Sequence, residues 1–190
     1  TARAPGHTYQ EAILKDSSRP PEAFLDHSYE FMGDQDIPYS HYTSKDYAAR
    51  EMENLWPHVW QMACREEHIA EPGDYQVYDI GHLSAIVTRT ESMEIKAYVN
   101  ACMHRGTALK PPGDNGFCQS FRCPFHGWIY SLDGELVEVP ESWDFPHVGA
   151  ETHSLREILV DTWSGFVFVN FDREAEPLDE FLGVLPEHFK

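Results

Sequence analysis

The sequence predicts a mainly β protein: an antiparallel β-sandwich or barrel with a helix on its N-terminal side. Three observations support this fold class. About seven short strand-like runs follow one another between residues 75 and 170. Two of these runs flank Asp133-Gly134, a pair typical of a tight hairpin because glycine tolerates a positive φ. Ahead of the strands, apolar residues recur at helical spacing between residues 44 and 56.

The first 40 residues predict an arm, separate from the folded unit. They are polar, carry prolines at positions 5, 20, 21 and 38, and have little periodicity. One short helix is expected around residues 10–15. A structured arm and a loose tail both remain open for this segment.

A helix is expected over residues 44–56. Thr43 or Ser44 can cap it, since hydroxyl side chains accept hydrogen bonds from the first free backbone amides. Pro57 should end it, because the residue before a proline avoids the helical region. We expect its apolar face to pack on the rest of the protein, with no chemistry of its own.

The strands that follow are short, as in sandwiches and barrels. Gly81 and His82 separate the first two, and the pair Asp133-Gly134 separates the fourth and fifth. At the end of the chain a helix is expected from residue 177, interrupted by Gly183 and Pro186. The expected strands are residues 75–80, 84–88, 95–99, 128–132, 135–139, 155–160 and 166–170.

Composition excludes several classes of protein. The 190 residues include 14 Lys and Arg against 32 Asp and Glu, a formal net charge of −18. Such an excess repels phosphate backbones and anionic membranes, so we expect no nucleic-acid or membrane partner. A hydrophobic content of 42% argues against disorder. Without a recognisable secretory signal or membrane-spanning run, the expected location is the cytoplasm, where cysteines stay reduced.

Two segments carry the chemistry: the run CMHRG at residues 102–106 and the run CPFHGW at residues 123–128. Each contains a cysteine, a histidine and a glycine, and the glycine- and proline-rich residues 111–116 between them should turn the chain back. Thiolate and imidazole both suit iron and zinc. The four side chains can therefore form a tetrahedral zinc site. They can equally hold a two-iron, two-sulfide cluster with the cysteines on one iron and the histidines on the other.

This paired motif resembles the cluster motif of Rieske non-haem iron oxygenases of the aromatic-ring-hydroxylating type, specifically their α subunit. The resemblance covers roughly residues 36–190. Outside the motif it extends to residues 56–60, 71–74, 130–134, 165–170 and 177–183.

The resemblance implies an antiparallel Rieske-type β-sandwich with the cluster-binding loops at one tip and a flanking N-terminal helix. Cys102 and Cys123 would bind one iron of a [2Fe-2S] cluster, and His104 and His126 the other. Residues 1–40 would be an N-terminal arm and residues 41–176 the Rieske domain. Residues 177–190 would begin the linker or catalytic domain, whose remainder is not in this sequence.

The resemblance also implies the electron-transfer part of a terminal oxygenase. A reductase or ferredoxin would supply electrons, which would pass to a mononuclear Fe(II) that hydroxylates a small organic substrate with O2. The full-length subunit would assemble as a homotrimer or as α3β3. A mononuclear site needs two histidines and a carboxylate; its nearest approach here is Asp144, His147 and His153, in a stretch expected to be a loop. A free-standing Rieske ferredoxin and a zinc-stabilised interaction module remain as alternatives.

Rieske proteins of cytochrome complexes carry one further cysteine in each loop, and Thr107 and Phe125 occupy these places here. This difference favours the oxygenase or soluble-ferredoxin branch, with a potential near the lower end of the roughly −150 to +300 mV Rieske range.

Residues 102–130 hold three basic residues and one acid, net +2, so the remainder carries −20. The positive tip can attract an acidic donor or simply balance the cluster's charge. The basic residues are Arg105, Lys110 and Arg122, and the acid is Asp114.

Overall fold

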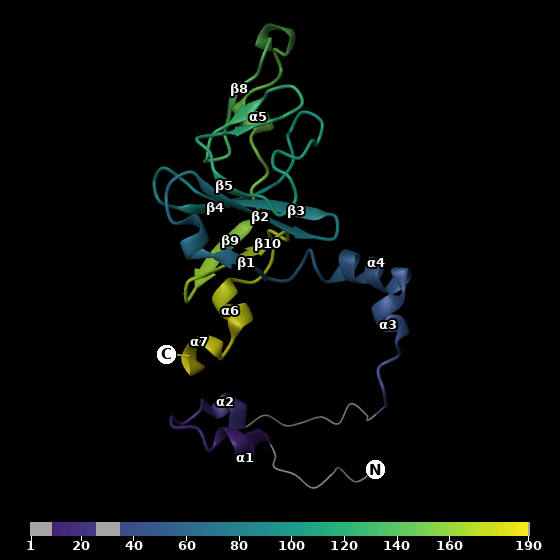
Figure 1. Ribbon diagram of the computed structural model, residues 1–190, viewed down its shortest axis with the longest axis vertical. Helices are drawn as coiled ribbons and strands as arrows, with labels where there is room; N and C mark the ends of the chain where they lie inside the picture. The colour runs from purple at the N-terminus through teal and green to yellow at the C-terminus, as the bar shows by residue number, and fades with distance from the viewer. Residues whose placement is uncertain (1–8, 26–34, 190) are drawn as a thin grey trace.

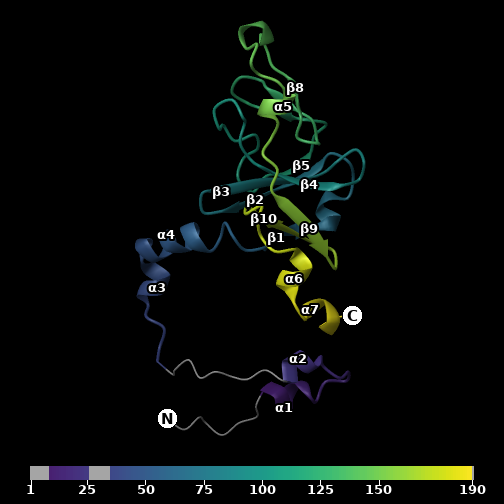
Figure 2. The ribbon, with the colours of Figure 1, turned by 180° about the vertical axis from the view of Figure 1, so that it is seen from behind.

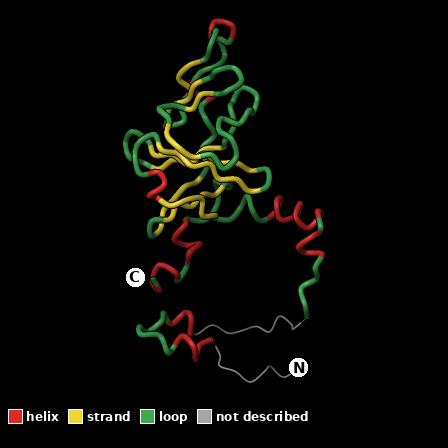
Figure 3. Tube along the Cα trace, in the orientation of Figure 1, coloured by secondary structure: helices red, strands yellow, loops and turns green. Residues whose placement is uncertain are grey.

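The computed structural model describes residues 9–25 and 35–189, and these ranges form three antiparallel sheets and a set of short helices (Figure 1). The strands gather in the middle of the molecule, and loops dominate the end that holds β8 and α5 (Figure 3). The same arrangement is seen from behind in Figure 2, where β9 and β10 lie on the side of the strands opposite to β8. The fold class predicted from the sequence, mainly antiparallel β, is confirmed.

The central sheet has the strand order β4-β3-β2-β5. β2 and β3 pair as far as Ile80 and Leu83, so Gly81 and His82 form the predicted two-residue turn. Four successive residues of β3 are buried, as expected for a strand covered on both faces. The strands are β2 (Asp74–Ile80), β3 (Leu83–Arg89), β4 (Ile95–Val99) and β5 (Asn115–Phe117).

A second sheet joins the first and last strands in the order β1-β10-β9. Gln61 on β1 lies opposite Val169 on β10, so the chain enters and leaves this sheet side by side. The indole nitrogen of Trp60 donates to the carbonyl of Glu176 at 2.8 Å, so a hydrogen bond joins the segment before β1 to the segment after β10. The strands are β1 (Gln61–Arg65), β9 (Leu159–Trp163) and β10 (Phe166–Asn170).

The third sheet, β6-β7-β8, consists of strands of two or three residues. The predicted hairpin joins β7 to β8, and Gly134 closes its turn by donating to the carbonyl of Ser131 at 3.0 Å. Gly134 has a φ of 78°, and a Cβ there would collide with the ring of Tyr98, so glycine is required twice over. The strands are β6 (Phe121–Arg122), β7 (Ile129–Tyr130) and β8 (Leu136–Glu138).

The helices are short. Ser44 caps α4, where its hydroxyl accepts from the amide of Tyr47 at 3.2 Å, as the sequence predicts. The helices are α1 (Tyr9–Ile13), α2 (Glu22–Leu25), α3 (Ser40–Thr43), α4 (Lys45–Asn54), α5 (Ala150–His153), α6 (Leu178–Leu182) and α7 (Leu185–His188), with the 3-10 turns η1 (Glu66–Ile69) and η2 (Ser142–Asp144). Within the described ranges no helix combines the length and apolar character needed to span a bilayer.

Three expectations need correction. The predicted strand 155–160 is displaced: β9 starts at Leu159, because residues 156–158 form only isolated contacts with β4. No residue of α4 is buried, although Met52 contacts the turn at Gly81, so the helix packs less than its apolar face predicts. Pro186 does not interrupt the last helix, since it lies in the first turn of α7, where a missing amide costs no hydrogen bond.

Two buried clusters make up most of the core. One lies between the central sheet and the β1-β10-β9 sheet, around Val87, Ala97 and Val167. The other extends from the central sheet to the loop-rich end and includes Cys102 and Cys123. The cysteine-bearing loops are therefore anchored in the hydrophobic core.

Candidate metal centre

The runs CMHRG and CPFHGW fold into two loops with the same backbone hydrogen bonds. In each, the amide of the cysteine donates to the carbonyl five residues later, and the amide four residues later, a glycine, donates back to the cysteine carbonyl. The bonds are Cys102 N to Thr107 O (2.8 Å), Gly106 N to Cys102 O (2.8 Å), Cys123 N to Trp128 O (2.8 Å) and Gly127 N to Cys123 O (3.1 Å). The two loops are thus copies of one local structure.

Glycine is needed at the same point of both loops. Gly106 has a φ of 73° and Gly127 a φ of 77°, values that side chains with a Cβ rarely adopt. The turn at each glycine reverses the chain just after the histidine. This is the local reason why both sequence runs place a glycine one or two positions beyond the candidate ligand.

Cys102 and Cys123 bring their thiols together in the core. Each residue is 3% exposed, and all four cysteines of the chain carry free thiols. Burial raises the pKa of Cys102, the hydroxyl of Tyr130 lowers it, and the neighbouring Cys123 thiol raises it again. The two thiols are close enough to influence one another's ionisation, as two ligands of one metal must be.

His104 and His126 form a second pair, with ring centroids 4.7 Å apart. The Nδ1 atom of His104 is buried and has no hydrogen-bond partner among the residues that the structure describes. Burial lowers the pKa of His104, and this favours the neutral imidazole that can ligate a metal. His126 is exposed, and the ring of Phe125 lies 3.9 Å from it.

Aromatic side chains hold the ring of His104 in place. Trp128, 2% exposed, stacks on it at 4.8 Å with an interplanar angle of 6°. Phe145 meets it edge-on at 6.1 Å. Trp128 is therefore a core residue that packs directly against a candidate ligand.

The donor set fits a two-iron cluster better than a single ion. Among the described residues, no group of three or more His, Cys, Asp or Glu side chains is placed to hold one metal ion. A tetrahedral zinc site would need all four donors around one centre. A [2Fe-2S] cluster of Rieske type needs them two by two, and buried thiols in one pair and imidazoles in another meet that need. The partnerless Nδ1 of His104 supports the same interpretation.

Tyr130 contacts the site, although the sequence indicated only a strand residue in a segment that resembles the family. It is fully buried, its hydroxyl lies 3.3 Å from the Sγ of Cys102, and it accepts the amide of Met103 at 3.0 Å. Burial and the thiol contact raise the pKa of Tyr130, so the hydroxyl keeps a proton that it can donate to a Cys102 thiolate. Nothing in the run around Tyr130 signals this contact, because its partner Cys102 lies 28 residues away along the chain.

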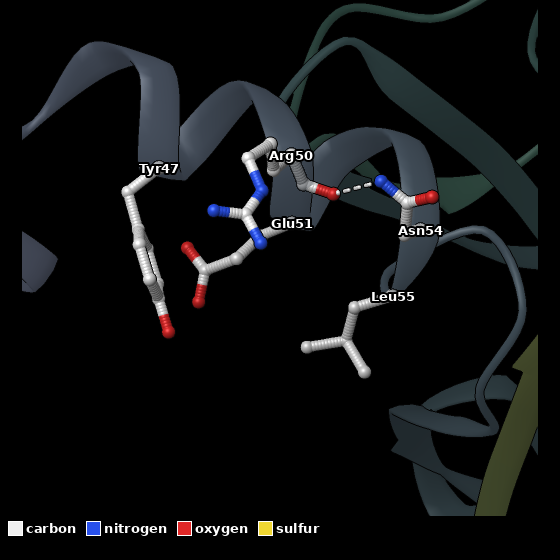
Figure 4. A pocket seen from close by; sticks show the side chains of 5 residues that line it. All are labelled: Tyr47, Arg50, Glu51, Asn54 and Leu55. Atoms are coloured by element: carbon white, nitrogen blue, oxygen red, sulfur yellow. Dashed lines mark hydrogen bonds between the residues drawn. The ribbon is translucent and has the colours of Figure 1, made fainter.

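The other candidates form no second metal site in the described part of the chain, although the ring of His153 packs edge-on against Trp128 at 5.8 Å. His147 and His153 have ring centroids 6.4 Å apart, but no carboxylate completes a three-ligand site with them in the described residues. Cys64 is buried in the core between the central and β1-β10-β9 sheets, and Cys118 packs at the edge of the other cluster. An open hollow along α4 is lined by Tyr47, Arg50, Glu51, Asn54 and Leu55 and contains neither Cys nor His (Figure 4).

In a comparison with known proteins, both cysteine–histidine loops fall within the match to one family model. Residues 59–149 match the model described as the Rieske [2Fe-2S] domain. The chain is 34% identical over 143 residues to the benzene 1,2-dioxygenase subunit alpha of Pseudomonas putida, covering 75% of this chain and 32% of that protein. It is 33% identical over 169 residues to the large oxygenase component of salicylate 5-hydroxylase from a Ralstonia species, covering 83% and 40%.

Solved structures agree. The crystal structure of naphthalene 1,2-dioxygenase from a Rhodococcus species, bound to indole, matches with a TM-score of 0.73 and 33% identity, covering 79% of this chain and 34% of that one. The chain therefore spans about a third of the length of the dioxygenase relatives that it matches. What the matching proteins do as whole molecules extends beyond this portion.

Proposed function

We propose that this chain, which carries a Rieske [2Fe-2S] domain homologous to the N-terminal Rieske region of the α subunits of aromatic ring-hydroxylating dioxygenases, is the electron-transfer part of a terminal oxygenase. The observation that carries the proposal is the pair of matching loops, which bring two buried thiols together and two imidazoles together. When bound, the cluster supplies one-electron transfer.

The ligand assignment is part of the proposal. Cys102 and Cys123 bind one iron, and His104 and His126 bind the other. The burial of the thiols and the partnerless Nδ1 of His104 support this division. The chain's own contribution is to hold these four side chains, to exclude water with Trp128, and to donate a hydrogen bond from the Tyr130 hydroxyl to Cys102.

The cluster's potential should lie near the lower end of the roughly −150 to +300 mV Rieske range. Trp128 occupies its place beside His104 without donating a hydrogen bond to either cysteine in the described structure, which leaves the hydroxyl of Tyr130 as the side-chain donor to Cys102. Fewer donors stabilise the reduced cluster less. A redox titration that gives a strongly positive midpoint would overturn this part of the proposal.

The whole protein would use O2 to hydroxylate a small organic substrate. A reductase or ferredoxin would supply electrons, the Rieske domain would pass them on, and a mononuclear Fe(II) in a catalytic domain outside these 190 residues would supply the oxygen chemistry. We propose a cytoplasmic homotrimer or α3β3 assembly, with residues 1–40 as an arm, 41–176 as the Rieske domain and 177–190 as the entry to the catalytic domain. The α1 and α3 helices lie in the proposed arm or at its border.

The basic residues near the loops support docking of an acidic electron donor. Arg105 and Arg122 are exposed, whereas the ammonium of Lys110 lies 4.1 Å over the ring of Tyr75. The two arginines therefore carry the proposed docking surface, and Lys110 contributes less than its sequence position suggests. Because the rest of the chain is strongly acidic, an acidic donor would be steered to this tip.

The variant Arg105→Glu tests this docking surface. The control is Arg173→Glu, because Arg173 is also an exposed arginine but lies in the loop after β10. Both variants change the net charge equally. Docking at the cluster tip predicts a slower, less salt-dependent electron transfer from an acidic ferredoxin in Arg105→Glu only. Equal rates and salt dependence in the two variants would rule the surface out.

A free-standing Rieske ferredoxin is the second candidate, and homology to oxygenase large subunits over 75% and 83% of the chain favours the oxygenase. Metal analysis tests the core of the proposal. We expect about two irons and two acid-labile sulfides per chain and reversible reduction by one electron. One zinc per chain without sulfide would instead establish the interaction module.

A further inference from the structure

Asn100 is a buried asparagine two residues before Cys102 whose side chain forms four hydrogen bonds. It is 5% exposed. Its Oδ1 accepts from the amides of Leu109 at 3.0 Å and Lys110 at 3.1 Å. Its Nδ2 donates to the hydroxyl of Ser84 at 3.0 Å and to the carbonyl of Lys110 at 2.8 Å. Both donor hydrogens and both oxygen lone pairs of the carboxamide are used.

These bonds close the first ligand loop. Asn100 stands just after β4, before the loop, and Lys110 stands beyond its end. The carboxamide ties the end to the start, and Ser84 ties both to β3 in the central sheet, where the amide of Asn100 also donates to the Ser84 carbonyl at 2.9 Å. Cys102 and His104 lie within the ring so formed.

The second ligand loop is held in a different way. It is flanked by β6 and β7, and Arg122 pairs with Ile129 directly across it. Phe121, fully buried, occupies the place two residues before Cys123 that Asn100 occupies before Cys102. The first loop has no such ladder, because after β4 the next strand, β5, starts only at Asn115. The side chain of Asn100 therefore holds the two ends of the first loop together, as the pairing of β6 with β7 does for the second loop.

We propose that Asn100 is the positioning residue of the first ligand loop: its carboxamide fixes Cys102 and His104 relative to the central sheet and so sets how firmly the cluster is held and how its ligands are oriented. This inference rests on the proposed assignment of Cys102 and His104 as ligands. It adds a residue whose side-chain hydrogen bonds to the loop go to the backbone of Leu109 and Lys110.

The test compares Asn100→Ala with Asn170→Ala in the chain carrying its cluster. Asn170 is a matched control: it is fully buried, donates to the carbonyl of His58 at 3.4 Å and accepts from the amide of Asp172 at 3.0 Å. It ends β10, in the sheet on the side of the central sheet away from the loop-rich end (Figure 1). Both substitutions remove a buried carboxamide and lower the melting temperature.

Two measurements distinguish an effect on the positions of the cluster ligands from a general loss of folding stability. Under an iron chelator, at a temperature where all variants are folded, Asn100→Ala should lose its cluster absorbance about 10-fold faster than the parent, as for other groups that orient metal ligands. Its reduced EPR g-values should also change. Asn170→Ala should match the parent in both. If Asn100→Ala behaves like Asn170→Ala, the inference is wrong.

A second pair covers failure to fold. If Asn100→Ala gives no folded protein, Asn100→Asp keeps the oxygen that accepts from Leu109 and Lys110 and removes the two donated bonds, and it is compared with Asn170→Asp by the same criteria. A parent chain that takes up no iron and sulfide refutes the proposed function, and this inference with it. A parent with a cluster, beside an Asn100 variant that holds it equally well, refutes this inference alone.

Discussion

Replacing Tyr130 with phenylalanine should lower the midpoint potential of the cluster. The Tyr130 hydroxyl accepts the amide of Met103 at 3.0 Å, so its own proton is free to point at the Sγ of Cys102, 3.3 Å away. A hydrogen bond to a thiolate favours the reduced cluster, which carries one more negative charge, over the oxidised one. Tyr130→Phe removes that preference while leaving the ring in place.

The size of the effect follows from these two bonds. A net hydrogen bond contributes about 1 kcal/mol. If that amount is lost mainly from the reduced state, the potential of a one-electron couple falls by about 40 mV, since about 59 mV corresponds to a tenfold change in the equilibrium constant. The amide of Met103 also loses its hydrogen-bond acceptor, which lowers the free energy of unfolding by a further ~1–3 kcal/mol in both redox states.

Tyr98→Phe is the matched control. Tyr98 is 2% exposed, and its hydroxyl donates to the carbonyl of Leu132 at 3.3 Å instead of to a candidate ligand. Optical redox titration of both variants measures the shift, and thermal unfolding measures the stability. A potential unchanged in Tyr130→Phe, or lowered equally in Tyr98→Phe, would refute the reasoning.

Three further predictions concern the fold around the site. Gly134→Ala should lower the free energy of unfolding by about 2–4 kcal/mol, measured by denaturant titration, because it combines a positive φ with a Cβ pressed into the Tyr98 ring; a loss under about 0.5 kcal/mol would contradict this. The hydrogen bond from His58 lowers the pKa of Asp172 below its ordinary 3.8, so this contact stabilises the fold above that pH and is lost as the pH falls through the lower folded value. The acid limb of the melting profile should be flatter in Asp172→Asn, and superimposable limbs would refute the assignment. Burial raises the pKa of Cys64 to about 11, so at pH 8 its thiol should react with a disulfide reagent about 100-fold more slowly than in the denatured chain; equal rates would show that the thiol is accessible.

Local chemistry explains what the sequence predicted. The turns at Gly81 and Gly134 need a positive φ, so a glycine at each position predicts the turn. The two cysteine–histidine runs could be recognised because each ligand loop is closed by hydrogen bonds between residues four or five apart, so the loop is encoded within its own segment. The ligand roles of Cys102 and Cys123 nevertheless stay predictions.

What the sequence missed depends on partners distant along the chain. Tyr130 lies 28 residues from Cys102, and Asn100 reaches ten residues ahead to Lys110; no pattern within a single segment reports either contact. β5 and β6, three and two residues long, are too short for any alternation to show. The apolar face of α4 was visible, but an amphipathic pattern does not say what covers it.

The central claim is that Cys102 and Cys123 hold one iron while His104 and His126 hold the other. Electron–nuclear double resonance on the reduced protein, with nitrogen-15 introduced only in histidine, tests it most directly. The account predicts couplings from two histidine nitrogens in the parent and the loss of one of them when either His104 or His126 is replaced by cysteine. A reduced cluster without histidine couplings, or couplings that survive both replacements unchanged, would contradict it.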